Sequence, residues 1–295
     1  GASLQSVQDV ARFELLVNGS LVEEGPVLAP ENSAPATENQ YVAVLSEGVF
    51  GPIAAGEVMP LPAIGARIAQ LQPTAVSLAP DRASAAVLHQ GVVSWVSPND
   101  LVQVDLRSGL LAPSLDRFGY VWSFAAESPN AILVTKPGER TAVLPVPWLG
   151  GRTPQAVRIS PGGSRVAVFV KDAGNPEQST VLVAGVVRDT TGDPLSFTDI
   201  ATSELWVSGT PVDLDWIDDQ RFVAISRNGV SGRITQGVLG QFAVDSGAVP
   251  GAVSVSGGGS RPLMRVLDDD GRLFAPQGSG WQRQQGAIAL LAKIG

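Results

Sequence analysis

The residue types that perform nucleophilic or thiolate-based catalysis are scarce in this chain. Its 295 residues include one histidine, His89, and no cysteine. A Ser-His-Asp triad needs a positioned acid and a nucleophile around its histidine, and the sequence signals neither near His89. A G-x-S-x-G elbow, a glycine-rich phosphate loop and metal-binding His/Glu spacing are also missing from the sequence. We therefore predict that the chain is not an enzyme, holds no metal and needs no cofactor, and that His89 is structural or solvent-exposed.

Two acidic runs are the strongest candidates for a cation site. They are DDDG at residues 268–271 and DLDWIDD at residues 213–219. Calcium takes about six to eight oxygen ligands at suitable spacing; the first run is too short for this, and neither run has the spacing of an EF-hand loop. Aspartate also caps its own backbone in tight turns. We therefore favour turn chemistry over calcium binding at both runs.

The strands and turns that carry these residues belong to an internal sequence repeat. Residues 42–61 align without a gap with residues 85–104, at an offset of 43, with five identical positions and the same apolar pattern. A weak repeat of about 40–50 residues built from short strands is typical of propeller blades. Similar pairs of apolar strands around a turn, which we interpret as the inner hairpins of blades, occur at residues 75–88, 121–134, 156–169, 213–225 and 263–275.

The repeats predict an all-β fold, a six-bladed β-propeller, with five blades as the alternative because residues 245–262 are ambiguous. The first repeat, residues 41–62, has the later strands of a blade and lacks an innermost one. The chain ends in GAIALLAKIG at residues 286–295, which resembles an innermost strand without a partner. We infer that residues 287–292 complete the first blade and close the ring, which removes exposed sheet edges.

Charged residues on the expected inner strands would meet in the central channel of such a ring. We place Asp213, Asp215, Arg158 and Arg265 in this position. One interpretation is mutual neutralisation around a water-filled channel, and the other is a site for a small polar ligand. We favour neutralisation, because any inner strand must put its polar groups in a wet environment.

The residues before the repeats have a different character. Residues 4–22 look like the last helical turn and final strand of a larger domain, and residues 25–40 are rich in Pro, Ala, Asn and Glu without periodicity. Such a composition is typical of a linker. We therefore divide the chain into a domain remnant at 1–24, a linker at 25–40 and a propeller domain at 41–295.

Composition restricts the partners of the chain. The net charge of −8 and pI near 4.7 argue against nucleic acid, because nucleic-acid binding requires basic patches that displace counterions. The sequence is 44% hydrophobic, yet no apolar run approaches the roughly 18–20 residues that span a bilayer. We expect no nucleic-acid partner and no membrane-spanning segment in this sequence.

Residues 110–124, LLAPSLDRFGYVWSF, resemble a segment of the actinobacterial LpqB lipoprotein family that reads roughly Leu-x-x-Pro-Ser-x-Asp-x-x-Gly-x-x-Trp. Residues 10–22 resemble the closing strand of the GerMN domain that precedes the propeller in that family, and residues 279–292 resemble its C-terminal strand pair. The matching residues of the segment are Leu110, Pro113, Ser114, Asp116, Gly119 and Trp122. We interpret Pro113, Asp116, Gly119 and Trp122 as structural, with Gly119 forming a turn, Asp116 capping it and Trp122 packing between blades.

This resemblance implies an accessory role. LpqB-like lipoproteins are anchored outside the cytoplasmic membrane, associate with the extracellular sensor region of the MtrB histidine kinase, and modulate MtrA–MtrB two-component signalling in cell-wall homeostasis and division. The lipid-bearing cysteine and the main GerMN body of that family are not in this sequence. We therefore expect the C-terminal part of a longer protein, with its own GerMN domains as further partners and a lipid anchor as its only membrane attachment.

A rigid ring presents loops from several blades as one surface, which suits binding of a protein partner. We expect the face that bears the inner-hairpin turns to be acidic and to steer a basic partner. The residues placed on this face are Asp81, Arg82, Asp218, Asp219, Asp268, Asp269 and Arg272. The alternative functions are a propeller that binds, or even hydrolyses, cell-wall glycan or peptide, and a structural spacer that stabilises the GerMN domains.

Overall fold

The computed structural model describes residues 12–17, 20–26, 42–54, 56–172, 174–175, 178–198 and 203–294, with the backbone alone described in the first two ranges. The chain separates into two compact units, residues 1–37 and 38–295. In the first unit, β1 (Arg12–Val17) pairs with β2 (Ser20–Pro26) in an antiparallel hairpin. The helical turn expected before β1 and the expected linker beyond Pro26 lie outside the described residues.

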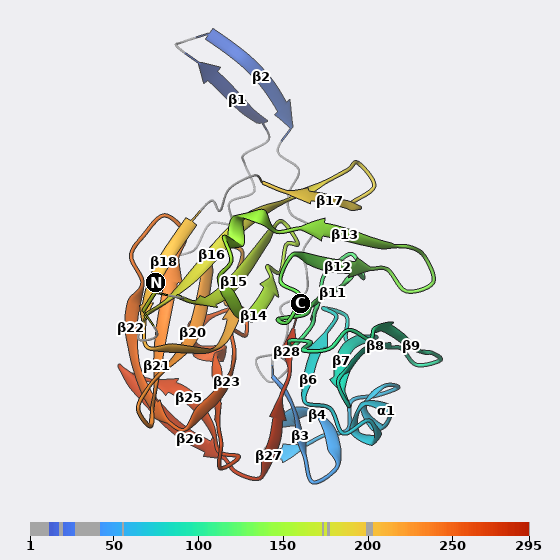
Figure 1. Ribbon diagram of the computed structural model, residues 1–295, viewed down its shortest axis with the longest axis vertical. Helices are drawn as coiled ribbons and strands as arrows, with labels where there is room; N and C mark the ends of the chain where they lie inside the picture. The colour runs from blue at the N-terminus through green and yellow to red at the C-terminus, as the bar shows by residue number, and fades with distance from the viewer. Residues whose placement is uncertain are drawn as a thin grey trace, which may run out of the picture. The chain divides into compact units, whose positions relative to one another are not determined.

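The second unit is a six-bladed β-propeller, so the predicted fold class is confirmed. Six sheets form a ring, and β28 lies near its middle (Figure 1). The innermost strands line a central channel. The alternative of five blades is excluded by the six sheets. The described helices are short, namely α1 (Gly65–Gln70) and the 3-10 helices η2 (Pro147–Leu149) and η3 (Arg261–Leu263).

The strands of each blade are given in order from the channel outward. Blade 1 contains β27 (Ile288–Leu291), β3 (Ala43–Ser46), β4 (Val49–Ala54) and β5 (Glu57–Val58). Blade 2 contains β6 (Ala75–Leu78), β7 (Ala85–His89), β8 (Val92–Val96) and β9 (Leu101–Asp105), with β28 (Lys293–Ile294) inside β6. Blade 3 contains β10 (Ser114–Leu115), β11 (Val121–Phe124), β12 (Ala131–Thr135) and β13 (Thr141–Pro145).

The remaining blades follow the same plan. Blade 4 contains β14 (Thr153–Ile159), β15 (Arg165–Lys171) and the long β16 (Gln178–Arg188), which pairs with both β17 (Pro194–Phe197) and β18 (Ser203–Ser208). Blade 5 contains β19 (Thr210–Trp216), β20 (Arg221–Asn228), β21 (Ser231–Val238) and β22 (Val244–Pro250). Blade 6 contains β23 (Ala252–Ser256), β24 (Arg265–Asp268), β25 (Leu273–Gln277) and β26 (Gly280–Gln285).

The sequence repeat corresponds to the second, third and fourth strands of blades 1 and 2. Its two hairpin turns are built alike: Glu47 and Gly48 have φ values of 49° and 80°, and Gln90 and Gly91 have φ values of 50° and 77°. Positive φ at both central residues is the two-residue turn whose twist matches that of antiparallel strands. Glycine at the second position supplies this conformation without a steric cost.

Closure of the ring by the C-terminus, as predicted, is also seen in the structure. Residues of β27 pair antiparallel with β3, and Leu291 lies opposite Val44. The chain then continues in an unpredicted way, because β28 leaves blade 1 and pairs parallel with β6 of blade 2, with Lys293 opposite Ser77. The last residues of the chain thus join the first two blades.

The hydrophobic core is divided among the interfaces between blades. Buried apolar residues form six clusters, and each cluster combines side chains from two neighbouring blades. In the cluster between blades 1 and 2, Leu290 of β27 packs with residues of α1 and β6. In the cluster between blades 4 and 5, Phe169 and Phe222 are fully buried. Each blade therefore depends on its neighbours for burial of its faces.

Two of the five expected inner hairpins were wrong. Residues 121–134 and 263–275 form the second and third strands of blades 3 and 6, because β10 and β23 precede them as the innermost strands. The strand β10 is only two residues long, too short to produce an alternating pattern. The strand β23 comes from the ambiguous residues 245–262, and its presence accounts for the sixth blade.

The ring closure makes a quantitative prediction. Replacement Leu290→Ala should lower the free energy of unfolding by about 2–5 kcal/mol, because it removes buried methyl groups and leaves a cavity where the closing strand packs. Urea unfolding followed by circular dichroism measures this. The matched control is Leu106→Ala, since Leu106 is 68% exposed and surface changes alter stability by about 0.5 kcal/mol or less. Equal losses in both variants would contradict the closure as described.

Candidate functional site

A cavity of about 330 Å³ occupies the central channel. Residues near the beginnings of the inner strands β6, β14, β19, β23 and β27 line it. Aliphatic side chains and polar groups share its wall, and the charged residues among them are Arg158, Asp213 and Lys293. The channel therefore contains a pocket with a charged patch.

The charged patch joins residues from three blades. Lys293 Nζ donates to Asp213 Oδ2 at 2.6 Å, and Arg158 Nη2 lies 3.8 Å from Asp213 Oδ1. Lys293 also donates to the carbonyl oxygens of Leu214 and Val255. Because β28 pairs with blade 2 while Asp213 belongs to blade 5, the Lys293 side chain reaches across the channel.

Burial and charge compete in setting the protonation of this patch. Burial alone would raise the pKa of Asp213, but the nearby charges of Lys293 and Arg158, with a hydrogen bond from Val255 N, bring its pKa below the usual 3.8. Burial lowers the pKa of Lys293, which its attraction to Asp213 only partly offsets. The positive charges of Lys293 and Arg158 thus favour the ionised form of the Asp213 carboxylate.

Lys293 was absent from the candidates drawn from the sequence. Its side chain reaches the channel because β28 crosses from blade 1 to blade 2. A lysine two residues from the end of the sequence carries no local pattern that predicts burial, and lysine is almost never fully buried unless it is paired. One signal could have pointed to it: the two expected channel carboxylates, Asp213 and Asp215, outnumber the nearby Arg158, so a second cation was needed to neutralise them.

Asp215 is close to the patch but has a different role. It is buried, and its Oδ2 accepts a hydrogen bond of 2.8 Å from Gly257 N at the end of β23. Asp213 Oδ2 does the same for Val255 N at 2.9 Å. The two aspartates thereby bond blade 5 to the neighbouring inner strand of blade 6. Burial raises the pKa of Asp215 above its usual value.

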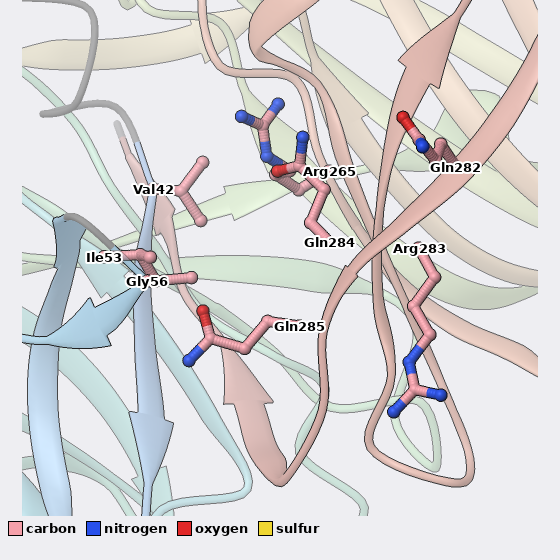
Figure 2. Close-up of a pocket in the computed structure, with 8 residues that line it drawn as sticks. All are labelled: Val42, Ile53, Gly56, Arg265, Gln282, Arg283, Gln284 and Gln285. Atoms are coloured by element: carbon pink, nitrogen blue, oxygen red, sulfur yellow. The ribbon is translucent and has the colours of Figure 1, made fainter.

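Arg265 does not lie in the channel, so its expected place was wrong. It begins β24, the second strand of blade 6, and donates to the carbonyl oxygens of Pro262 and Met264. Figure 2 shows it in a separate pocket of about 410 Å³ with Val42, Ile53 and Gln285. Within the described residues it forms no ion pair, and burial lowers its pKa.

The seven residues expected on one acidic face are divided between two faces. We call the end of the ring that carries the turns between first and second strands, residues 79–84, 116–120, 160–164 and 217–220, the inner-turn face. Asp219 Oδ1 accepts from Gly162 N at 2.7 Å, which joins the inner turns of blades 4 and 5. Asp81, Arg82, Asp218 and Asp219 belong to this face.

Asp268, Asp269 and Arg272 lie on the opposite face, so the expected single acidic face was wrong. They form the turn between β24 and β25, the second and third strands of blade 6, and successive turns of an antiparallel sheet alternate between its two ends. The hydrogen bond from Asp269 N to the carbonyl oxygen of Gly251, just before β23, shows this placement. The cause is again the innermost strand β23, which shifts these residues one turn along the blade.

Most of these carboxylates are engaged in their own turns. Asp218 accepts from the backbone nitrogens of Gln220 and Arg221 and from Arg221 Nε. Asp268 is buried and accepts from Arg272 N at 2.7 Å and Arg272 Nε at 2.6 Å. Such bonds are the turn chemistry favoured for the acidic runs, and they are seen at Asp218 and Asp268. Asp213 and Asp215 of the same run lie in β19 and bond to blade 6 instead. Among the described residues, no group of three or more His, Cys, Asp or Glu side chains could hold a metal ion.

Asp116 is the most heavily bonded carboxylate of the inner-turn face. Its Oδ1 accepts from the backbone nitrogens of Phe118 and Tyr120 at 2.9 Å each, while Gly119 turns the chain with a φ of 81°. Its Oδ2 accepts from Trp122 Nε1 at 2.8 Å. Asp116 thus caps the turn and also fixes the buried indole of Trp122 between blades 3 and 4. Pro113, at the start of this segment, is buried.

Arg188 connects this turn to blade 4. Its Nη2 donates to Asp116 Oδ2 at 2.6 Å, and its Nε and Nη1 donate to the carbonyl oxygens of Gly163 and Gly192. The guanidinium lies 4.4 Å from the centroid of the Phe118 ring, a cation–π contact. Nearby, Tyr120 donates its hydroxyl to Asp193, and burial together with this carboxylate raises the pKa of Tyr120 to about 12.

A hollow of about 500 Å³ lies beside this turn on the inner-turn face. Residues from the inner turns of blades 2, 3 and 4 line it, among them Asp81, Arg117 and Pro161. Phe118 stands next to Arg117 and keeps 38% of its surface exposed. The face therefore offers one concave area lined by charges of both signs, with the exposed ring of Phe118 next to its lining residue Arg117.

His89 has a structural environment. Its Nε2 lies 2.9 Å from Ser94 Oγ, and both residues are buried. Burial lowers the pKa of His89 and favours the neutral ring. A fully buried serine hydroxyl is not accessible to a substrate.

A second surface groove, of about 460 Å³, lies on the outside of blades 4 and 5. Trp206 of β18 and Phe242 of the turn between β21 and β22 line it, and these rings are 59% and 95% exposed. Glu204 and Gln241 add polar groups to the same groove. Exposed aromatic rings beside polar side chains can stack on and hydrogen-bond to a ligand.

Comparisons with known proteins identify relatives of this fold. The family model for the lipoprotein LpqB beta-propeller domain matches residues 48–290. No curated protein sequence gives a significant match.

The chain also aligns with solved structures at low identity. They include a chain of the mitotic checkpoint complex (12% identity, 91% of this chain and 93% of that chain, TM-score 0.45) and Hsv2 of Kluyveromyces lactis (13%, 78% and 77%, TM-score 0.39). A third is a protein from Lactobacillus plantarum (12%, 81% and 74%, TM-score 0.46). These likenesses carry no argument about function.

The Asp116 bonds predict the effect of removing its charge. Replacement Asp116→Asn should lower the free energy of unfolding by about 3–5 kcal/mol, because it leaves the largely buried Arg188 cation without its counter-ion. Chemical unfolding monitored by tryptophan fluorescence measures this. Asp81→Asn is the matched control, since Asp81 is exposed and its only described bond is from Ala83 N. An Asp116→Asn variant as stable as the wild type would refute this role.

Proposed function

Because the chain belongs to the lipoprotein LpqB β-propeller family, we propose that it is a non-enzymatic, extracytoplasmic interaction module that modulates a sensor histidine kinase of the MtrB kind. In this proposal the propeller binds the extracytoplasmic region of the kinase and so affects cell-wall and division signalling. The GerMN domains of the same protein are proposed as its second partner.

The proposed location rests on the family. A family of lipoproteins supports attachment to the outside of the cell membrane through a lipid, and we propose this location for the whole protein. In the described part of the chain, no helix is both long and apolar enough to cross a bilayer.

The observation that carries the proposed interaction is the hollow on the inner-turn face. Aromatic and arginine side chains near a concave area are typical of residues that dominate protein–protein binding energy. Phe118 and Arg117 provide this combination, and the Asp116–Arg188 bond holds the turn that presents them. Because the turn is fixed before binding, little conformational entropy is lost on association.

Charge supports a basic partner surface. The chain has a net charge of −8, which would accelerate encounter with a positively charged surface and make association sensitive to salt. The affinity itself would depend more on the buried contacts at Phe118. The salt dependence and the effect of Phe118 are thus separable.

The proposal predicts which face binds. The double replacement Arg117→Ala/Phe118→Ala should weaken binding to the extracytoplasmic region of the cognate kinase at least tenfold, as expected for loss of a hot spot of about 2 kcal/mol or more. Surface plasmon resonance with the full-length protein and with this propeller measures this, after melting curves confirm that the variant folds.

The matched control lies on the opposite face. Asp269→Asn/Asp270→Asn changes two exposed residues there and should alter the affinity less than about twofold. If the full-length protein binds and the propeller does not, recognition lies outside this chain. If the folded double variant binds like the wild type, the inner-turn face is not the interface.

The second candidate function is binding of a cell-wall glycan. The specific observation in its favour is the groove with Trp206 and Phe242, since sugar rings stack on exposed aromatic faces while carboxylate and amide groups bond to hydroxyls. Glu204 forms an ion pair with Arg152 at 3.3 Å, which orients one of the polar groups.

This candidate predicts a ligand-dependent gain of stability. Soluble cell-wall glycan fragments should raise the melting temperature of the wild-type protein, and Trp206→Ala should abolish this shift. Trp281→Ala is the matched control, because Trp281 is half-buried and its Nε1 donates to the Ser246 carbonyl oxygen. The absence of any shift with the wild type, or an unchanged shift with Trp206→Ala, would reject glycan binding in this groove.

A further inference from the structure

One arginine at the contact between blades 6 and 1 can be compared with its counterparts in other blades. Arg165, Arg221 and Arg265 begin the second strands of blades 4, 5 and 6. The residue after each of them packs into the cluster shared with the preceding blade. Because successive side chains of a strand point to opposite faces of the sheet, all three arginines face the following blade. The three positions are therefore equivalent.

Arg265 differs from the other two arginines in its partners. Arg165 Nη1 donates to the carbonyl oxygen of Asp219 in the inner turn of blade 5, at 3.0 Å. Arg221 Nε donates to Asp218 Oδ2 at 2.6 Å. Arg265 uses only its Nη1, which donates to two carbonyl oxygens of its own turn. Its Nε and Nη2 have no hydrogen-bond partner among the described residues, and neither atom is sealed from solvent.

The closure of the ring explains this difference. In blades 2 to 6 a turn joins the first strand to the second, but in blade 1 these strands, β27 and β3, come from opposite parts of the chain. Blade 1 therefore has no inner turn that could offer a carbonyl oxygen to Arg265, and the turn of blade 6, residues 257–264, contains no carboxylate. A pocket of about 410 Å³ lies here, lined by Arg265 and by Val42, the residue before β3.

The walls of this pocket are rich in hydrogen-bonding groups. Figure 2 shows Arg265 on the side of blade 6, with Val42 and Ile53 of blade 1 across the space. Three glutamines of β26 also line the pocket, and their amides form no hydrogen bond among the described residues: Gln282, Gln284 and Gln285. Side-chain amides both donate and accept hydrogen bonds, and the volume lies within the range of about 300–1,000 Å³ typical of small-molecule pockets. The pocket therefore suits a small polar ligand.

The free edge of Arg265 suits a single carboxylate. Nε and Nη2 form one side of the planar guanidinium, and this side binds both oxygens of a carboxylate in two parallel hydrogen bonds. Arg283 also lines the pocket, but its guanidinium points away from that of Arg265 (Figure 2). One cation balances one carboxylate, whereas a phosphate monoester carries about 1.5 to 2 negative charges at neutral pH.

We propose that the pocket between blades 6 and 1 binds a small acid whose carboxylate is attached to a polar body with hydroxyl or amide groups. The carboxylate pairs with the Nε–Nη2 edge of Arg265, and the polar body bonds to the glutamine amides. The pocket is separate from the hollow beside Arg117 and from the groove at Trp206. The inference therefore goes beyond the proposed function and does not depend on it.

Two sources of this chemistry can be tested together. Glucuronate represents a sugar acid and N-acetylserine represents the end of a peptide; each is compared with its neutral amide, and butyrate is an acid without a polar body. Titration calorimetry with the intact chain at millimolar ligand should show binding of at least one polar acid, and the tighter one identifies the source. Its neutral amide and butyrate should bind at least about tenfold more weakly, because each lacks one half of the recognised chemistry.

Several outcomes of this titration would overturn the proposal. They are binding of neither polar acid, equal binding of the neutral amide or of butyrate, and tighter binding of inorganic phosphate than of both polar acids.

Variants locate the bound acid. Arg265→Gln should weaken binding at least about tenfold, because it removes two charge-assisted hydrogen bonds. Arg221→Gln is the matched control: it makes the same change at the equivalent position of blade 5, outside the pocket, and should leave the affinity unchanged. Gln284→Glu is nearly isosteric at an exposed position and places a negative charge in the pocket, so it should abolish binding even if Arg265→Gln fails to fold. Unchanged affinity in a folded Arg265→Gln or Gln284→Glu variant would exclude this site.

Discussion

The structure of the propeller depends on the pairing of its last strand with its first. A ring of sheets has no free edge only if the chain closes it, and here β27 provides the innermost strand that the first blade lacks. Without this strand, β3 would present unpaired backbone groups, and the apolar clusters on both sides of blade 1 would lose Leu290 and Leu291. Because each cluster lies between two blades, a defect at the closure affects both neighbours.

The same closure creates the charged centre of the channel. After β27 the chain crosses to blade 2, and this crossing brings Lys293 opposite Asp213 of blade 5. A buried ion pair of this kind contributes little net stability, because removing two charges from water offsets much of their attraction. Its effect is to fix residues 293–294 to blade 5 on the other side of the channel.

The inner-turn face is organised by a second buried pair, Asp116 and Arg188. This pair connects the turn of blade 3 to the long hairpin of blade 4 and holds Phe118 at the surface. Residues that carry the family resemblance are thus structural, while the residues next to them face the solvent. A binding surface can therefore change its side chains while the turn that presents them stays the same.

The sequence by itself determined the all-β propeller, the repeat shared by blades 1 and 2 and the closing role of residues 287–292, because alternating apolar residues and turn glycines are local signals. It also indicated that Asp116 caps a turn. Only the tertiary structure decided the site. A two-residue strand such as β10 and the ambiguous β23 give no periodic signal, so Asp268 was assigned to the wrong face and Arg265 to the wrong pocket. Lys293 meets Asp213 across 80 residues of sequence, and no local pattern encodes such a contact, because it arises from the closure of the ring.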